Sequence, residues 1–246
     1  MYRYQLLIEY DGSNYIGWQK QKKGNSIQGT LEKTLSKVFK EKIVIQGSGR
    51  TDKGVHALGQ SSHFDINKEI NNTNKLTKSL NFFLKKKNIS ILKIIKKTKN
   101  FHARFSAKDR IYKYIILNRL SPSSIKSGKV WHVVNKLDIK EMKKGCKSLE
   151  GTHNFSTFRS SSCNAKSPIR TIKKITIKKN NNEIIFRFRS QSFLQQQVRS
   201  MVGCLKYLGE NKWTFNKFYK IFKSKKRTLC GPIAPSDGLF LEKVIY

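Results

Sequence analysis

The chain has 246 residues, which is long enough for one large domain or two smaller ones with a buried core. It carries 51 Lys and Arg against 15 Asp and Glu, a formal net charge of +36, and its 37% apolar content excludes a disordered chain. This charge predicts a polyanionic partner, nucleic acid before an anionic membrane. No apolar run approaches the roughly 18 residues of a membrane span, and the first residues do not resemble a signal peptide. We therefore expect a cytoplasmic protein without a membrane partner.

The cysteine spacing argues against a metal site. Cys146, Cys163, Cys204 and Cys230 form no CxxC pair and no Cys/His cluster of the zinc type. We expect free, buried thiols and no bound metal.

The first half of the chain predicts the order β-α-β-β-α-β. Asn25 is the expected N-cap of the first helix, with Gln28 as its capping-box partner. The predicted strands cover residues 2–10, 42–46, 57–64 and 89–95, and the predicted helices cover 25–39 and 73–84.

The second half predicts the same order. Asp138 and Glu141 form a capping box for a helix to about Leu149, and Ser192 with Gln195 begins another that runs to about residue 207. The predicted strands cover residues 110–117, 169–178, 183–189 and 239–245. The sequence thus predicts an α+β fold of two ferredoxin-like (RRM-like) halves, residues 1–105 and 106–246, with a central mixed or antiparallel sheet.

The most unusual segment is GSGRTDKGVHA, residues 47–57. It places Asp52 between Arg50 and Lys53 among three glycines, and these cations favour the ionised carboxylate. A carboxylate repels phosphate, so a reacting group explains it better than a phosphate-binding loop, and G-x-x-x-x-G-K-[ST] is absent. Residue types alone slightly favour the alternative, a turn aspartate satisfied by backbone N–H groups and an arginine.

This segment resembles the signature of the tRNA pseudouridine synthase A family, and further blocks in the same order extend the resemblance over almost the whole chain. They are residues 10–19 (YDGSNYIGWQ), 26–32 (SIQGTLE), 80–81 (LN), 101–107 (FHARFSA), 112–114 (YKY), 151–156 (GTHNFS), 168–170 (PIR), 193–203 (FLQQQVRSMVG) and 234–239 (APSDGL). Two positions depart from the family pattern: Gln197 stands where Met is usual and Ser200 where Asn is usual.

The resemblance implies an isomerase that converts uridine to pseudouridine in the anticodon stem-loop of tRNA, around positions 38–40. It implies a homodimer that uses neither metal nor organic cofactor. The catalytic aspartate matches Asp52 and the active-site tyrosine matches Tyr112. The base-displacing arginine matches Arg50, and the arginine that pairs with the aspartate matches Arg199.

These residue types suit the chemistry. A carboxylate can attack C1′ or C6 of the uridine, or assist formation of a glycal, and the sequence leaves these routes open. The stacked base must be flipped out, and the guanidinium of Arg50 can fill its place. The ring of Tyr112 can stack on the extruded base while its hydroxyl assists proton transfer.

Plainer interpretations stand beside these roles. Burial statistics alone favour Tyr112 as a core aromatic, and Arg199 alone is compatible with a surface arginine whose stem lies on the core. Two other functions are a non-catalytic RNA-binding protein with RRM-like sheets and a tRNA chaperone that has lost its chemistry. Neither requires an aspartate among glycines in a basic region, nor an intact set of four site residues.

Overall fold

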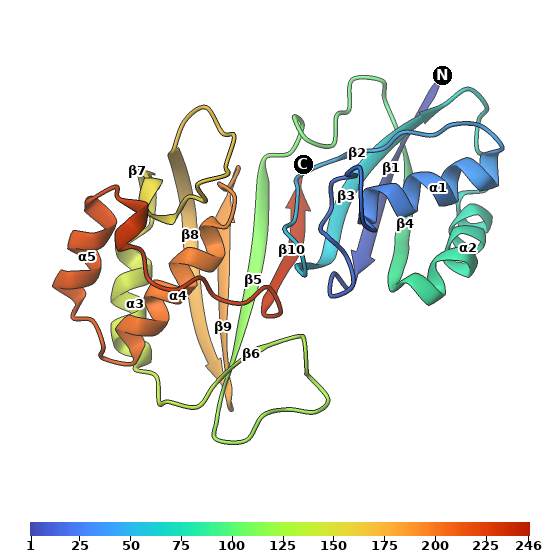
Figure 1. Ribbon diagram of the computed structural model, residues 1–246. Coiled ribbons are helices and arrows are strands. Elements are labelled where there is room, and N and C mark those ends of the chain that lie inside the picture. The colour runs from blue at the N-terminus through green and yellow to red at the C-terminus, as the bar shows by residue number, and fades with distance from the viewer. The chain divides into compact units, whose positions relative to one another are not determined.

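The computed structural model describes residues 1–246, with five α-helices and ten strands in two compact units (Figure 1). Unit 1 comprises residues 1–108 and 240–246, and unit 2 comprises residues 109–239. The predicted α+β class is confirmed. None of the helices combines the length and the apolar character that crossing a membrane requires.

Unit 1 is a sheet with the strand order β4-β1-β3-β10 and two helices on one face (Figure 1). The strands pair antiparallel, except that β10 runs parallel to β3; the short β2 pairs antiparallel with β3. The elements are β1 (Tyr2–Tyr10), α1 (Ile27–Phe39), β2 (Gln46–Gly47), β3 (His56–Ile66), α2 (Thr73–Leu84), β4 (Ile89–Lys97) and β10 (Leu239–Ile245).

The apolar pattern explains why the helices cover this face. Along β1 the buried residues Tyr4, Leu6 and Ile8 recur at every second position, as expected for one face of a strand. Phe64 of β3 stands opposite Tyr4 and contacts Phe39 of α1. Each such buried side chain stabilises the fold by about 1.5–3 kcal/mol.

The segment 98–108 covers the other face of the unit 1 sheet. Arg3 donates to Asp65 and also to the carbonyls of residues 99 and 101. The backbone N–H of Ala103 donates to Nδ1 of His63 over 3.1 Å, and the hydroxyl of Tyr246 donates to the Ala103 carbonyl. Strand β3 is therefore buried on both faces, and polar contacts hold the cover in place.

Unit 2 is an antiparallel sheet with the strand order β5-β9-β8-β7, with β6 parallel to β5 and α3, α4 and α5 on one side (Figure 1). The elements are β5 (Asp109–Asn118), β6 (Trp131–Val133), α3 (Ile139–Ser148), β7 (Gly151–Asn154), β8 (Ile169–Asn180), β9 (Glu183–Ser190), α4 (Gln197–Gly209) and α5 (Phe215–Lys223). Short 3-10 turns occur at Lys85–Lys87, Ser156–Phe158 and Arg227–Leu229.

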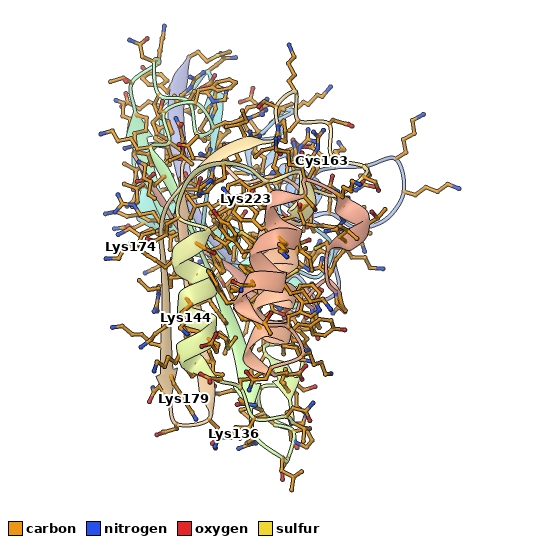
Figure 2. All side chains as sticks on the ribbon, turned by 90° about the vertical axis from the view of Figure 1, so that its left-hand side faces the viewer. Lys136, Lys144, Cys163, Lys174, Lys179 and Lys223 are labelled. Atoms are coloured by element: carbon orange, nitrogen blue, oxygen red, sulfur yellow. The ribbon has the colours of Figure 1, made fainter.

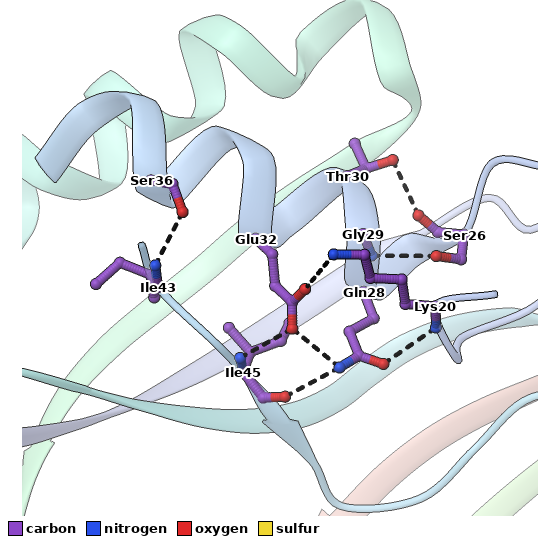
Figure 3. A network of polar contacts seen from close by, with 9 residues as sticks. All are labelled: Lys20, Ser26, Gln28, Gly29, Thr30, Glu32, Ser36, Ile43 and Ile45. Atoms are coloured by element: carbon purple, nitrogen blue, oxygen red, sulfur yellow. Dashed lines mark hydrogen bonds and ion pairs between the residues drawn. The ribbon is translucent and has the colours of Figure 1, made fainter. Parts of the chain in front are cut away.

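Two predictions near α1 are wrong (Figure 3). Ser26, not Asn25, is the N-cap, because its hydroxyl accepts from the N–H of Gly29. Gln28 is not a capping partner: its side chain accepts from the N–H of residue 20 and donates to Glu32.

The predicted strand over residues 42–46 is also wrong in its bounds, because only Gln46–Gly47 forms β2. Side chains of α1 accept hydrogen bonds from backbone N–H groups that would otherwise pair with a neighbouring strand. The N–H of Ile43 donates to the hydroxyl of Ser36, and the N–H of Ile45 donates to the carboxylate of Glu32 (Figure 3).

Helix α4 begins at Gln197 and not at the predicted Ser192. Gln196 adopts a left-handed conformation with φ of 62°, which interrupts a right-handed helix. The side chain of Gln197 accepts from the N–H of Leu194 in the segment before the helix, and no side chain caps the first turn. The predicted N-cap Asp138 of α3 is confirmed, since its carboxylate accepts from the N–H groups of residues 140 and 141.

The compact units and the predicted halves divide the chain differently at two places, and the halves stay a prediction. The first boundary falls between residues 108 and 109, three residues beyond the predicted one. Residues 240–246 of β10 group with unit 1, where Phe240 and Leu241 stand opposite His56 and Ala57 of β3. The assignment of this last strand to the second ferredoxin-like half stays a prediction.

The four cysteines are free thiols, of which three are buried and Cys230 is half-buried. Burial raises the pKa of the Cys146 thiol to about 12, so this side chain acts as a neutral core residue.

Candidate active site

The loop between β2 and β3 carries Arg50 and Asp52. Residues 48–55 form neither helix nor strand; Arg50 is exposed, Thr51 is buried and Asp52 is half-buried. The N–H of Val55 donates to the carbonyl of Asp52 over 3.2 Å, which closes a turn after the carboxylate. The aspartate thus lies in an irregular but tightly bonded segment.

Strand β3 holds the first part of this loop through Gln60. Its side-chain oxygen accepts from the hydroxyl of Ser48 over 2.8 Å, and its side-chain nitrogen donates to the carbonyl of Gly49 over 3.0 Å. Gln60 is fully buried. A buried amide satisfied in this way fixes the backbone of the loop just before Arg50.

The segment between β1 and α1 holds the second part of the loop. The N–H of Trp18 donates to the carbonyl of Thr51 over 3.0 Å, and the N–H of Gly54 donates to the carbonyl of Tyr15. Gly17 has φ of +115°, and a side-chain carbon there would lie 2.6 Å from the Thr51 carbonyl oxygen. Only glycine permits both this conformation and this close approach.

Tyr112 lies on β5 in unit 2, on the face that also buries Tyr114 and Ile116. The Tyr112 side chain is 9% exposed, and its ring meets that of Phe193 edge to face, with centroids 5.2 Å apart. The predicted strand face is confirmed, and the tyrosine is largely buried.

Arg199 lies on α4 and is half-buried. Its Nε donates to the carbonyl of Ala234 over 2.7 Å, and the N–H of Ala234 donates to the carbonyl of Arg199 over 3.2 Å. This reciprocal pair joins α4 to the segment before β10. At the second departure from the family pattern, the Ser200 hydroxyl accepts from Arg227, so this position stays hydrogen-bonded.

The four predicted site residues are divided between the units. Arg50 and Asp52 belong to unit 1, and Tyr112 and Arg199 belong to unit 2. The expected pairing of Asp52 with Arg199 would therefore join the two units, and it stays a prediction. No group of three or more His, Cys, Asp and Glu is placed to hold a metal ion.

Positive charge is not confined to the glycine-rich loop. On unit 2, exposed lysines project from the layer of α3 and α5 and from β8 (Figure 2). The labelled examples on these elements are Lys144, Lys174, Lys179 and Lys223, and the labelled Lys136 lies in the segment before α3. The charge thus predicts broad electrostatic attraction of a polyanion and does not by itself locate a binding site.

Comparison with known proteins decides the family. The model of a family described as tRNA pseudouridine synthase matches residues 6–106 and 146–246. Proteins named tRNA pseudouridine synthase A are 62% identical over the full lengths of both chains in Pelagibacter ubique, and 42% identical over both full lengths in Sinorhizobium fredii. The chain belongs to the tRNA pseudouridine synthase family. The predicted membership, and with it the class of isomerase, is confirmed.

Sequence reasoning missed Gln60, whose side chain holds the loop that carries Asp52. Gln60 lies inside β3, and the strand predicted over residues 57–64 did not mark it as a residue that holds the loop. A glutamine in the middle of a strand that is otherwise buried was the available signal, because a buried amide must find partners.

Proposed function

We propose that this protein isomerises uridine to pseudouridine in the anticodon stem-loop of tRNA, around positions 38–40, with Asp52 as the nucleophile. The observation that carries the proposal is the half-buried carboxylate in a loop bonded on both sides, by Gln60 and by the backbone of Trp18. A turn aspartate needs no such support. Membership of the synthase family over nearly the whole chain supplies the reaction class.

In the proposed reaction, the bond between N1 of uracil and C1′ breaks and a bond between C5 and C1′ forms. The hydrogen on C5 is released to water as a proton, and N1 gains a proton, so the reaction is an isomerisation without an external reagent. The carboxylate of Asp52 assists either by attack at C1′ or C6 or by promoting a glycal. Fixing the loop beforehand saves the entropy of orienting this group during the reaction.

The other site residues take the roles that the resemblance implies. Flipping the base out of the stack costs a few kcal/mol. Arg50, which is exposed and close to Asp52 in the chain, fills the place that the base leaves. Tyr112 stacks on the flipped base through its ring and assists proton transfer through its hydroxyl. Arg199, fixed by its bond to residue 234, pairs with the aspartate.

The proposed partner is tRNA, bound through its phosphates by a chain of net charge +36. Each neutralised duplex phosphate lowers the logarithm of the affinity by about 0.9 per tenfold rise in salt, so we expect a steep salt dependence. We also propose a homodimer in the cytoplasm, from the family resemblance alone. Light scattering at micromolar concentration tests the dimer.

The decisive experiment replaces Asp52. Asp52→Asn and Asp52→Ala are incubated with an unmodified tRNA transcript carrying tritium at C5 of uridine, and tritium release is followed. We expect no release, with a wild-type melting curve and equal or tighter tRNA binding, because the removed charge repels phosphate. Asp138→Asn is the matched control: it removes one carboxylate charge at the N-cap of α3 and keeps a good capping residue.

Three outcomes would contradict the proposal. Substantial tritium release by folded Asp52→Ala would exclude Asp52 as the nucleophile. A melting curve lowered as for a lost cap, about 0.5–2 kcal/mol, with turnover preserved, would identify a structural turn aspartate instead. A wild-type protein that binds tRNA but forms no pseudouridine would favour the non-catalytic RNA-binding function.

A further inference from the structure

A pair of buried hydroxyls joins the loop that carries Asp52 to the end of β1. The hydroxyl oxygens of Tyr10 and Thr51 are 2.8 Å apart, and the two side chains are 3% and 6% exposed. Tyr10 is the last residue of β1, so the pair connects the end of a central strand to the residue before the aspartate. The loop therefore has a side-chain anchor in addition to its backbone bonds.

The backbone contacts of Thr51 make this anchor consequential. Its carbonyl accepts from the N–H of Trp18, and Gly17 packs against the same carbonyl and against the Asp52 backbone. The peptide unit that joins Thr51 to Asp52 is planar, so the position of Thr51 sets the point from which the carboxylate projects. With its backbone held on one side and its hydroxyl on the other, Thr51 has a single available orientation.

We propose that the Tyr10–Thr51 hydroxyl pair is a positioning device that fixes Asp52 for the reaction. The inference rests on the proposed role of Asp52. Tyr10 and Thr51 do not touch the substrate; they act through the aspartate. Since a misplacement of about 1 Å costs on the order of a hundredfold in rate, loosening the pair should slow the chemical step and leave tRNA binding unchanged.

Separate variants remove each of the two hydroxyls. Tyr10→Phe removes one hydroxyl and keeps the ring that packs near Trp18, with centroids 6.2 Å apart. Thr51→Val removes the other and keeps the shape of the side chain. Thr51→Ser keeps the hydroxyl and is the conservative rescue. The measurements are the single-turnover rate of tritium release at saturating tRNA, the tRNA affinity and a melting curve.

We expect Tyr10→Phe and Thr51→Val each to slow the single-turnover rate by about ten- to a hundredfold. The double variant should be no slower than the slower single one, because both remove the same interaction. Thr51→Ser should retain most of the rate. All these variants should bind tRNA like the wild type.

Tyr4→Phe is the matched control. Tyr4 lies on the same strand, is fully buried, and its hydroxyl accepts from the N–H of Ile70, away from the loop. Tyr4→Phe also loses a tyrosine hydrogen bond, here a partly buried one, so its melting curve should fall, while its rate stays at the wild-type value. A merely structural role for Tyr10 predicts equal rates for these two variants.

The outcomes separate this inference from the proposed function. If Asp52→Asn is inactive while Tyr10→Phe and Thr51→Val keep the wild-type rate, the positioning role is overturned and the nucleophile stands. Turnover by folded Asp52→Asn overturns both. Slow Tyr10→Phe and Thr51→Val, with Tyr4→Phe at the wild-type rate, support the positioning role.

Discussion

The central strands of the two units are buried in different ways. In unit 1, β3 buries both faces and much of what it buries is polar, including Gln60, Ser61, Ser62 and His63. In unit 2, β9 alternates: Ile184, Phe186 and Phe188 are fully buried, and the residues between them are more exposed. The first strand therefore depends on hydrogen-bond partners and the second on apolar packing.

This difference follows from what covers each sheet. Unit 1 has helices on one face and the segment 98–108 on the other, and that segment contacts the sheet through Arg3, His63 and Tyr246. A polar contact is directional, so a network of them fixes relative positions more sharply than apolar packing does. The loop with Asp52 leads directly into β3, so the polar strand lies next to the aspartate that we propose as the reacting group.

The largest effect that this comparison predicts is in unit 2. Phe186→Ala should lower the free energy of unfolding by about 3–5 kcal/mol, because it leaves a cavity in a core with little else to compensate. Phe186 is fully buried, stacks near Phe188 and stands opposite Tyr114 of β5. Equilibrium unfolding in urea measures the change.

Phe186→Leu is the control, since it keeps an apolar side chain and should cost about 1.5 kcal/mol or less. If the two variants lose the same stability, volume is not what this strand contributes, and the contrast between the units fails.

An intermediate effect should come from His63 as the pH falls. Burial, then the nearby charge of Arg3, lowers the pKa of His63 to about 4, against 6.5 for the free side chain. The unfolded chain therefore binds a proton in this window while the folded one does not, so stability is full above pH 6.5 and is lost as the pH falls toward 4. The expected loss is about 2–3 kcal/mol, measured by urea unfolding at a series of pH values.

Two other groups near His63 have shifted pKa values, so the control must separate their effect on stability from that of His63. His102 also has a lowered pKa, mainly from desolvation, and acts with the same sign. Arg3 holds the pKa of Asp65 below its usual value, so that carboxylate affects stability only below the window. His63→Gln should flatten most of the slope between pH 6.5 and 4 and leave only the part due to His102. An unchanged slope would contradict the assignment.

The sequence predicted well the elements that apolar periodicity defines, and it predicted the polar contacts poorly. Strand and helix periodicity located β1, α2 and β10 with the correct bounds, because the spacing of apolar residues directly reflects which face is buried. The Asp52 loop was found through its motif. The backbone-to-side-chain contacts were not: Glu32 accepting from the N–H of Ile45 replaces a predicted strand, and such partners depend on tertiary contacts that periodicity does not encode.

The smallest predicted effect compares two adjacent serines of β3. Ser61 and Ser62 are both buried, at 1% and 0% exposure, and point to opposite faces because successive strand residues alternate. The Ser61 hydroxyl accepts from the side chain of Gln5 over 2.9 Å and is hydrogen-bonded to the hydroxyl of Tyr246 over 2.7 Å. The Ser62 hydroxyl oxygen has no hydrogen-bond partner, and its strand neighbour on the helix-covered face is Leu6.

Ser61→Ala should therefore cost about 1–3 kcal/mol, because the buried Gln5 amide and the Tyr246 hydroxyl both lose a hydrogen-bond partner. Ser62→Ala removes a buried polar atom that gains nothing from burial, so it should change stability by about 0–1 kcal/mol in the stabilising direction. Each variant serves as the control for the other, since the substitution, the strand and the extent of burial are the same. Urea unfolding of both variants measures the difference.

If the two serines behave alike, hydrogen bonding is not what distinguishes the polar strand of unit 1, and burial alone would set its stability. If Ser61→Ala alone is costly, the polar contacts between the sheet and its cover contribute directly to holding the unit together.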